Sequence, residues 1–415
     1  MLDDSTTDIR HIPKIELHAH LNGSIREATL FEFAEERNIQ LNGSFFNNPA
    51  SDIVEAIDDN NDRTALIYNK RHRSLAECFD IFIEIGKVVI DLVAIQRITR
   101  EALEDFAKEG VVYLELRSTP KRLLPTRRRC DGTFSLASVA IEELATKRQY
   151  CETVINTLID FRKEEEERYG KELKDVTKSQ DALKSPRLPM IASFIVSVDR
   201  SNSVDQGFEN IDLAIQLAKE YPGVVVGVDL GGNPLKRSFL DFRGCFEKAR
   251  QSGLLSITLH CGEVPCTNDQ DSAAYMDALS ILNFGPTRLG HALILPPGLQ
   301  QKLAELEIPV ETCPTSNVMT TELVEKSSGG SLVEGVKRHP QLQQWLENKH
   351  PICICTDDPG VFNTDATQEF VLLQEAFALE IRDFQDIVLN AVDYAFTDEE
   401  TKAILKNRIR TKKYK

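Results

Sequence analysis

Several features that mark broad classes of protein are scarce or missing in this chain of 415 residues. No apolar run approaches the roughly 20 residues that a membrane-spanning helix requires, so we expect no membrane span. Acidic residues outnumber basic ones by 65 to 49, which gives a formal net charge of −16. Binding along a nucleic-acid backbone or on an anionic membrane needs clustered Lys and Arg, so neither partner is expected.

The nine cysteines are odd in number, scattered, and form no Cys-x-x-Cys pair. Three of them, Cys313, Cys353 and Cys355, lie inside apolar runs. This pattern argues against a zinc ribbon and favours reduced, buried thiols over a disulfide framework. The first residues of the chain are acidic and lead into no apolar run, so they do not predict a signal peptide. We therefore expect a cytoplasmic protein, located in the cytosol.

Eight short runs rich in apolar or β-branched residues recur along the chain and are predicted to be strands. These runs are Lys14–His18, Val111–Arg117, Met190–Val198, Val224–Leu230, Leu255–His260, Thr287–His291, Ile308–Cys313 and Pro351–Thr356. Longer stretches between or after them, such as Asn210–Tyr221, Phe239–Gln251 and Thr367–Leu379, are predicted to be helices. Alternating strands and helices form parallel sheets, and eight repeats predict an α/β (β/α)8 TIM barrel that makes 1–415 a single domain.

Two segments depart from this repeat. Residues 25–108 are too many for one loop and one helix, and Arg73–Val93 is predicted to be helical, so this segment should add helices that cover the barrel mouth as a lid. Residues 161–188 are strongly charged and include four consecutive glutamates. We expect them to form an exposed helical extension followed by a mobile loop, which is a solvated insertion and not a binding tail.

Histidine and carboxylate side chains gather at the ends of the predicted strands. His18 and His20 are two residues apart, so their side chains point to the same side of a strand. His260 and Asp357 end two further runs. The carboxyl ends of barrel strands form one face, and three imidazoles with one carboxylate suit a catalytic zinc ion. Such an ion would produce hydroxide at neutral pH.

Three other polar residues at the same face suit proton transfer and substrate binding. Glu263, which follows His260 by three residues, is a candidate proton donor, while His291 and Asp358 would position hydroxide and substrate. Taken singly, His291 also fits a buried core histidine, and the Asp357-Asp358 pair also fits a helix start. His339 and His350, beside prolines, are not assigned to this set, and Cys261 is interpreted as a small buried filler.

Four motifs occur in barrel order: His-Ala-His-Leu-Asn-Gly-Ser from His18, His-Cys-Gly-Glu from His260, Arg-Leu-Gly-His ending at His291, and Thr-Asp-Asp-Pro from Thr356. Over nearly the whole chain the sequence resembles the adenosine and AMP deaminase family of metal-dependent barrels. Within it, the sequence is most similar to the adenosine deaminase-like, or N6-methyl-AMP deaminase, branch. The resemblance implies one Zn²⁺ per chain.

The resemblance also implies roles for individual residues. The zinc ligands would be His18, His20, His260 and Asp357. Glu263 would protonate purine N1, His291 would orient the hydroxide, Asp358 would engage hydroxide and N7, and the backbone of Gly232 would approach N3. The full set expected to contact substrate is His20, Asn22, Ser118, Thr119, Lys121, Asp199, Gly232 and Asp358.

Asn22 is the strongest indication of the substrate. Adenosine deaminases usually carry Asp at the matching position, beside the ribose 5′ hydroxyl, and a carboxylate there would repel a 5′-phosphate. Asn keeps hydrogen-bonding capacity without the charge. Thr119 and Lys121 are the favoured phosphate contacts, while Arg117 and Arg200 are either further phosphate contacts or partners in structural ion pairs.

These observations predict a hydrolase that converts N6-methyl-AMP and water to IMP and methylamine. An adenosine or AMP deaminase is the alternative within the class. A catalytically inactive barrel that binds nucleotides or a protein is an alternative of another class. A two-metal amidohydrolase would need a bridging lysine at a strand end, and the fourth strand ends instead at Asp229-Leu230-Gly231-Gly232. The expected partner is a small purine nucleotide, and the chain is expected to be a monomer.

Overall fold

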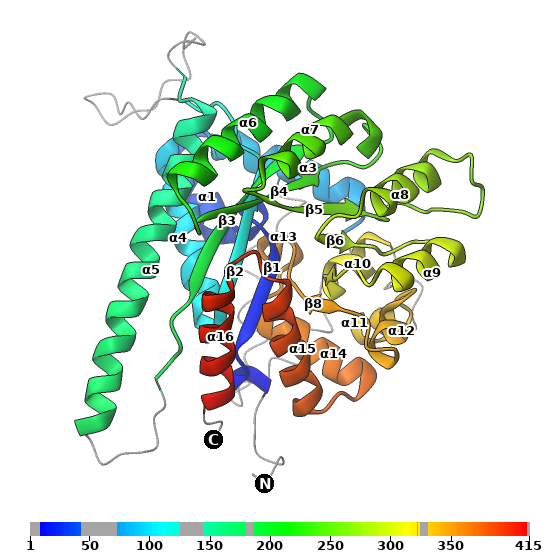
Figure 1. The fold of residues 1–415 in the computed structure, drawn as a ribbon. Coiled ribbons are helices and arrows are strands. Elements are labelled where there is room, and N and C mark those ends of the chain that lie inside the picture. The colour runs from blue at the N-terminus through cyan, green and yellow to red at the C-terminus, as the bar shows by residue number, and fades with distance from the viewer. Residues whose placement is uncertain are drawn as a thin grey trace.

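Eight parallel strands lie at the centre of the molecule, with helices around them (Figure 1). The computed structural model describes residues 9–42, 73–124, 144–178, 186–321, 323 and 331–412. The strands are β1 (Lys14–His20), β2 (Val111–Ser118), β3 (Ile191–Asp199), β4 (Val225–Gly231), β5 (Ser256–Cys261), β6 (Arg288–His291), β7 (Val310–Thr312) and β8 (Ile352–Ile354). Each strand pairs in parallel with the next, in the order β1 to β8. The predicted (β/α)8 barrel is confirmed, and every predicted strand overlaps an observed one.

The seam between β8 and β1 is closed by residues just beyond the end of β8. The backbone N–H of Asp357 donates to the carbonyl of His18 over 2.9 Å, and the N–H of His20 donates to the carbonyl of Asp357 over 2.9 Å. Ala19 and Asp357 form an isolated parallel bridge. The last strand is thereby joined to the first at the level of the polar strand ends.

The helices that surround the barrel follow most strands. They are α1 (Glu27–Arg37), α3 (Leu75–Val88), α4 (Leu92–Lys108), α5 (Lys147–Lys178), α6 (Val204–Glu220), α7 (Phe239–Ser252), α8 (Ala273–Phe284), α9 (Pro297–Leu306), α10 (Pro314–Thr320), α11 (Leu332–Lys337), α12 (Leu342–Glu347), α13 (Pro359–Phe362), α14 (Ala366–Phe377), α15 (Ile381–Tyr394) and α16 (Glu399–Thr411). Short 3₁₀ turns cover Ile9–His11 and Asn22–Ser24. No helix in the described ranges is both long and apolar enough to cross a membrane.

Capping residues explain where the helices differ from the sequence prediction. The predicted helix Arg73–Val93 is two helices, because Asp91 accepts a hydrogen bond from the N–H of Ala94 and starts α4. Helix α6 begins at Val204, six residues before the predicted start, because Ser203 and Gln206 form a capping box. Local hydrogen bonds at helix starts outweigh apolar periodicity at these boundaries.

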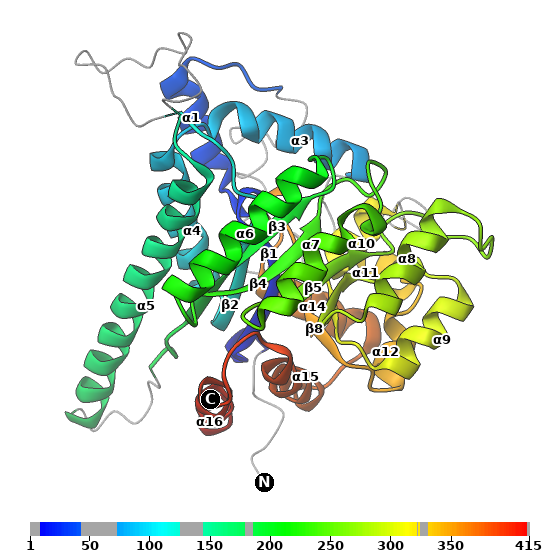
Figure 2. The same cartoon turned by 45° about the horizontal axis from the view of Figure 1, so that its top comes forward.

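Of the helices that follow β1, α3 lies over one end of the barrel, whereas α4 packs along its side against α5 and β2. In Figure 2, α3 lies across the end of the barrel away from both chain termini. Three of its side chains, Leu75, Phe79 and Phe82, line the cavity into which the polar strand ends point. This helix therefore forms one wall of the cavity. Residues 43–72 of the segment lie outside the described residues.

Helix α5 carries the charged stretch predicted as an exposed extension. Most of the consecutive glutamates are exposed, but Glu165 is buried and accepts hydrogen bonds from Arg168 and Arg187. It ties α5 to the chain that leads into β3, so for this residue the expected exposure was wrong. The loop predicted after the helix falls at 179–185, outside the described residues.

Candidate active site

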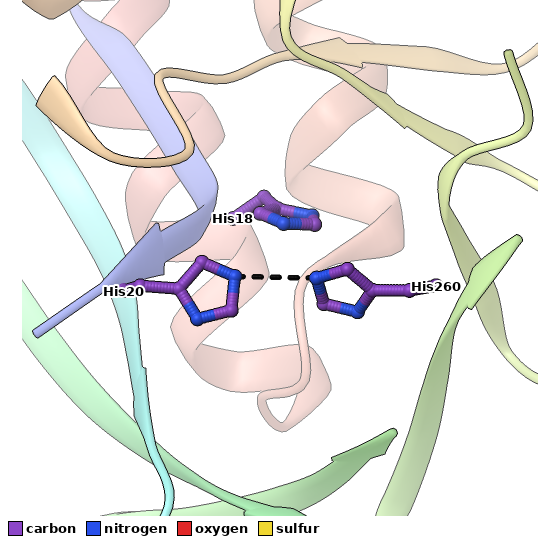
Figure 3. Close-up of side chains that lie close together, drawn as sticks. All are labelled: His18, His20 and His260. Carbon is purple, nitrogen blue, oxygen red and sulfur yellow. Dashed lines mark hydrogen bonds between the residues drawn. The ribbon is translucent and has the colours of Figure 1, made fainter. Parts of the chain in front are cut away.

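Four side chains converge from two adjacent strand ends and one across the barrel. His18 and His20 come from β1 and His260 comes from β5 (Figure 3). Asp357 follows β8. The Nε2 atoms of His20 and His260 are 3.2 Å apart. Oδ1 of Asp357 lies 3.3 Å from Nε2 of His18 and 3.4 Å from Nε2 of His20. The structure thus brings all four predicted metal ligands together.

The donor atoms fit a divalent metal ion of the zinc type. In a tetrahedral zinc site with bonds of about 2.0–2.1 Å, neighbouring ligand atoms are about 3.3 Å apart. The three distances above match this spacing. In addition, Nε2 of His18 is buried and has no hydrogen-bond partner among the described residues. A buried polar atom without a partner is costly, and a metal ion would satisfy it. A second possible set, His18 with His291 and Asp357, is equally compact.

Local backbone geometry holds these side chains close together. Asp357 adopts φ 63° and His291 adopts φ 58°, in the left-handed region that costs most residues free energy. A Cβ atom at Gly290 would lie 2.9 Å from Cε1 of His18, and one at Gly23 would lie 1.6 Å from Oδ1 of Asp358. Any larger residue at these two glycines would displace site side chains.

Buried carboxylates orient two of the histidines from behind. Nδ1 of His18 lies 2.6 Å from Oε2 of Glu311, and Nδ1 of His260 lies 2.9 Å from Oδ1 of Asp229. Carboxylates in this position fix the imidazole so that Nε2 faces the metal. Burial and the charge of Arg117 disfavour the charged form of His18, but the nearby carboxylates of Asp357 and Glu311 raise its pKa to about 9. The pKa of Asp229 is lowered by His260 and Arg117 despite its burial.

Arg117 and Arg288 supply the positive charge that keeps these carboxylates ionised. Arg117 is fully buried, lies 2.9 Å from Glu311 and is also close to Asp229. Arg288 pairs with Glu311 and with Glu115. These contacts keep the pKa of Glu311 well below its usual range although burial opposes this. Arg117 is therefore an ion-pair partner in the barrel interior.

Arg200 is also engaged in structural contacts. Its guanidinium is 1% exposed and lies 3.1 Å from Oδ2 of Asp277 on α8. It also donates to the backbone carbonyls of Arg237 and His260. Of the two interpretations left open for Arg117 and Arg200, the structure supports structural ion pairs over phosphate binding, because neighbouring carboxylates and carbonyls pair with both guanidinium groups inside the protein.

Glu263, His291 and Asp358 lie around the same cavity. Nε2 of His291 is 3.8 Å from Oε1 of Glu263. Oδ1 of Asp358 is buried and has no hydrogen-bond partner in the part of the chain that the structure describes. Burial, together with the charges of Asp357 and Glu263, raises the pKa of Asp358 well above its usual range. The three groups can exchange protons and hydrogen bonds with a molecule in the cavity.

The predicted substrate contacts all lie on the wall of this cavity. Those outside the metal set are Asn22, Ser118, Thr119, Lys121, Asp199 and Gly232. Ser118 is less available than expected, because its hydroxyl lies 2.6 Å from the hydroxyl of buried Tyr150 on α5. Lys121 is exposed, and its ammonium has no hydrogen-bond partner among the residues that the structure describes. Its charge interacts with that of Asp199, and the ammonium can also bind an anion in the cavity.

Several cavity and supporting residues were missed by sequence reasoning. The apolar wall contains Leu75, Cys78, Phe79, Phe82, Leu293 and Phe362. Their apolar character is that of any core residue, so no sequence signal separates them from packing. The sequence did contain a signal for Glu311, since a carboxylate within an apolar strand is costly unless it is paired and therefore indicates a buried partner. Asn317 contacts His291, and its amide side chain gave no sequence signal of that partner.

Comparisons with known proteins show the family to which the chain belongs. The family model for adenosine deaminase matches residues 13–412. The N6-mAMP deaminase of Arabidopsis thaliana is 33% identical, and the match covers 96% of each chain. The N6-methyl-AMP deaminase of Danio rerio is 29% identical over 96% of this chain and 95% of its own. A solved structure of Arabidopsis ADAL complexed with GMP has a TM-score of 0.71 at 31% identity, covering 97% of this chain and 98% of its own. The chain belongs to the adenosine deaminase family, whose members are metal-dependent.

Proposed function

We propose that this protein is a zinc-dependent deaminase that converts N6-methyl-AMP and water to IMP and methylamine. One observation carries the proposal: the cavity combines a His and Asp cluster that fits a metal ion with an uncharged Asn22 and the ammonium of Lys121. The cluster fits hydrolysis at a purine ring, and the other two residues fit a 5′-phosphate. The similarity to N6-methyl-AMP deaminases, and to structures described as complexes with IMP and GMP, supports it.

The proposed zinc ligands are His18, His20, His260 and Asp357. When bound, the ion would lower the pKa of a water molecule from about 15.7 towards about 7 and so supply a nucleophile at neutral pH. Ser316 donates a hydrogen bond of 2.7 Å to Oδ2 of Asp357. This bond holds Oδ1 of the same carboxylate towards the histidines.

Glu263 and Asp358 would handle the protons of the reaction. Glu263 borders the cavity and is partly exposed to it, so its carboxyl group can donate a proton to purine N1. Oδ1 of Asp358, which has no partner within the described residues, can hydrogen-bond to the attacking water and to N7. His291 would orient the water. The backbone of Gly232, at φ 83°, can approach the purine because no Cβ stands in the way.

The remaining cavity residues would bind the two ends of the substrate, which are the 5′-phosphate and the N-alkyl group. Asn22, Thr119 and Lys121 would bind the phosphate through an amide, a hydroxyl and a cation. The apolar wall from α3, which includes Phe79 and Phe82, suits an uncharged N-alkyl group. A nucleotide with a methylated amine presents both an anion and such a group.

The test is a comparison of kcat/KM for N6-methyl-AMP, AMP and adenosine on the zinc-loaded protein, followed by loss of purine absorbance. We expect N6-methyl-AMP to be preferred. A higher value for adenosine would refute the assigned substrate and leave an adenosine deaminase. Glu263→Gln, assayed beside the native protein, should lower kcat by roughly 10²- to 10⁴-fold and so shows that the activity belongs to this site.

A further inference from the structure

A buried row of three side chains leads away from the cavity. Nδ1 of His291, at the end of β6, lies 3.0 Å from Oδ1 of Asn317 on α10. Nδ2 of Asn317 lies 3.1 Å from Nε2 of His339, between α11 and α12. All three residues are buried. His339 is thus connected to the cavity through Asn317 and His291.

The far side of His339 determines which of its nitrogens carries the proton. Its Nδ1 atom lies 3.2 Å from the backbone nitrogen of Gln341 and 3.0 Å from that of Leu342, at the start of α12. Both are N–H donors, so Nδ1 accepts. Burial lowers the pKa of His339 to about 3, so the ring is neutral and has one N–H group. That group must be Nε2–H.

The proton on His339 sets the direction of the Asn317 amide. Nε2–H of His339 needs an acceptor, and the carbonyl end of the amide can serve. The two ends of an amide have nearly the same shape, so the hydrogen-bond network decides which end points where. The carbonyl then faces His339, and the NH₂ group faces His291 and donates to its Nδ1. His291 accordingly carries its proton on Nε2, towards the cavity.

We propose that His339 and Asn317 are positioning residues that hold His291 as the Nε2–H tautomer, so that its cavity-facing nitrogen is a hydrogen-bond donor. His291 then donates to an oxygen in the cavity, such as that of the attacking water, and cannot accept a proton from it. This role rests on the proposed deaminase function. It also separates the two possible metal sets, because a protonated Nε2 has no lone pair for a metal ion.

The segment around His339 also holds the backbone next to His291. The side-chain amide of Gln341, which is 2% exposed, donates to the carbonyls of Ala292 and Leu293. Ala292 has φ 47°, so this backbone is in a costly conformation that the two hydrogen bonds help to maintain. The ring of Trp345 lies 5.7 Å from that of His339 and packs against it. One short segment thus fixes both the ring of His291 and the turn after it.

The direct test is two-bond ¹H–¹⁵N correlation NMR on the zinc-loaded full chain with ¹⁵N-labelled histidine. The spectrum distinguishes protonated from unprotonated ring nitrogens, and signals are assigned by comparison with single histidine variants. We expect both His291 and His339 to be Nε2–H tautomers. A His291 protonated on Nδ1, or one whose Nε2 is bound to the metal, would overturn the proposal. No substrate is needed, so this result is independent of whether the proposed function is correct.

Two variants test the row of three buried side chains, and a third variant is the matched control. Asn317→Asp can only accept, so Nδ1 of His291 should become protonated in the spectrum and kcat should fall about 10- to 100-fold with little change in KM. His339→Gln can still donate to Asn317 and should retain the His291 tautomer and more of the activity. His350→Gln changes the other histidine packed on Trp345 and should alter neither. An unchanged tautomer in Asn317→Asp would contradict the proposal. If each variant shows the tautomer expected for it but the protein acts on no purine nucleotide, the proposed function is wrong and the positioning role of Asn317 and His339 stands.

Discussion

Nδ1 of His18 lies 2.6 Å from Oε2 of Glu311, and both side chains are completely buried. Glu311 also accepts hydrogen bonds from Arg117, Arg288 and Thr258. Because the two arginines keep the carboxylate charged, its natural partner on His18 is an N–H group at Nδ1. With a metal ion bound, Nε2 of His18 would then be the unprotonated nitrogen that faces the other site residues. One carboxylate thus links the charges inside the barrel to the geometry of the proposed metal site.

Replacing this carboxylate should weaken both metal binding and the fold. In Glu311→Gln the hydrogen bond to His18 becomes weaker and the buried arginines lose a compensating charge. We expect metal affinity to fall roughly 10- to 100-fold. The free energy of unfolding should fall by about 3–5 kcal/mol. Metal titration against a competing chelator and urea denaturation would measure the two effects.

Glu305→Gln is the control for this change, since Glu305 is an exposed residue on α9 whose carboxylate contacts only a neighbouring Gln in the described structure. It should leave both quantities within about 0.5 kcal/mol of the native value. If Glu311→Gln bound the metal as tightly as Glu305→Gln, the orienting role of this carboxylate would be wrong.

Removal of the metal should be reversible and should affect stability as well as activity. A strong chelator is expected to abolish turnover, and about one equivalent of Zn²⁺ per chain should restore it. Since a ligand that binds only the folded state stabilises it, the melting temperature should fall on removal and rise again on reloading. Metal analysis, activity and thermal unfolding on the same samples provide the measurement. Full activity in metal-free protein would contradict the proposed mechanism.

The sequence predicted the barrel and the meeting of its polar strand ends well, because both follow from simple periodicity. Strands end on one face in a parallel barrel, so His18, His260 and Asp357 had to lie on the same side once the eight runs were recognised. Strand and helix boundaries were less accurate where a cap decided them, as at Asp91 and Ser203.

What the sequence could not show was which charged residues pair with one another. Arg117 fitted both a phosphate contact and an ion pair, and only its distance to Glu311, 194 positions away, decides between them. The row from His291 to His339 was hidden for the same reason. Asn317 and His339 are polar residues of ordinary appearance, and their meaning lies in the atoms that face each other after folding.

A charge at position 22 should change the preference between nucleotide and nucleoside. Asn22→Asp places a carboxylate where we propose that the 5′-phosphate binds. We expect kcat/KM for N6-methyl-AMP to fall roughly 10- to 100-fold, about 1.4–2.8 kcal/mol, while the value for the corresponding nucleoside falls less or rises. Asn156→Asp, on the exposed face of α5, makes the same chemical change away from the cavity and should alter neither. Equal losses on both substrates would argue against a phosphate beside Asn22.

The ion pairs of Glu165 should stabilise the fold in a pH-dependent way. Burial alone would raise the pKa of Glu165, but hydrogen bonds from Arg168 and Arg187 outweigh it, so the pKa lies below its ordinary value of 4.5. A carboxylate whose pKa is lowered on folding adds stability above its unfolded pKa, and this stability is lost as the pH falls through the folded value. Glu165→Gln should therefore lower the free energy of unfolding by about 1–2 kcal/mol at neutral pH.

The same reasoning gives the pH at which the difference between native protein and Glu165→Gln should disappear. The difference in unfolding free energy should be constant above about pH 5.5 and should shrink as the pH drops below the ordinary pKa of Glu. It should be small once Glu165 is protonated in both the folded and the unfolded state. Urea denaturation at a series of pH values measures it. Glu167→Gln alters an exposed neighbour on the same helix and should show no such trend. Because comparison of the two variants cancels the general acid sensitivity of the protein, a difference that persisted unchanged at low pH would mean that Glu165 acts through packing and not through its charge.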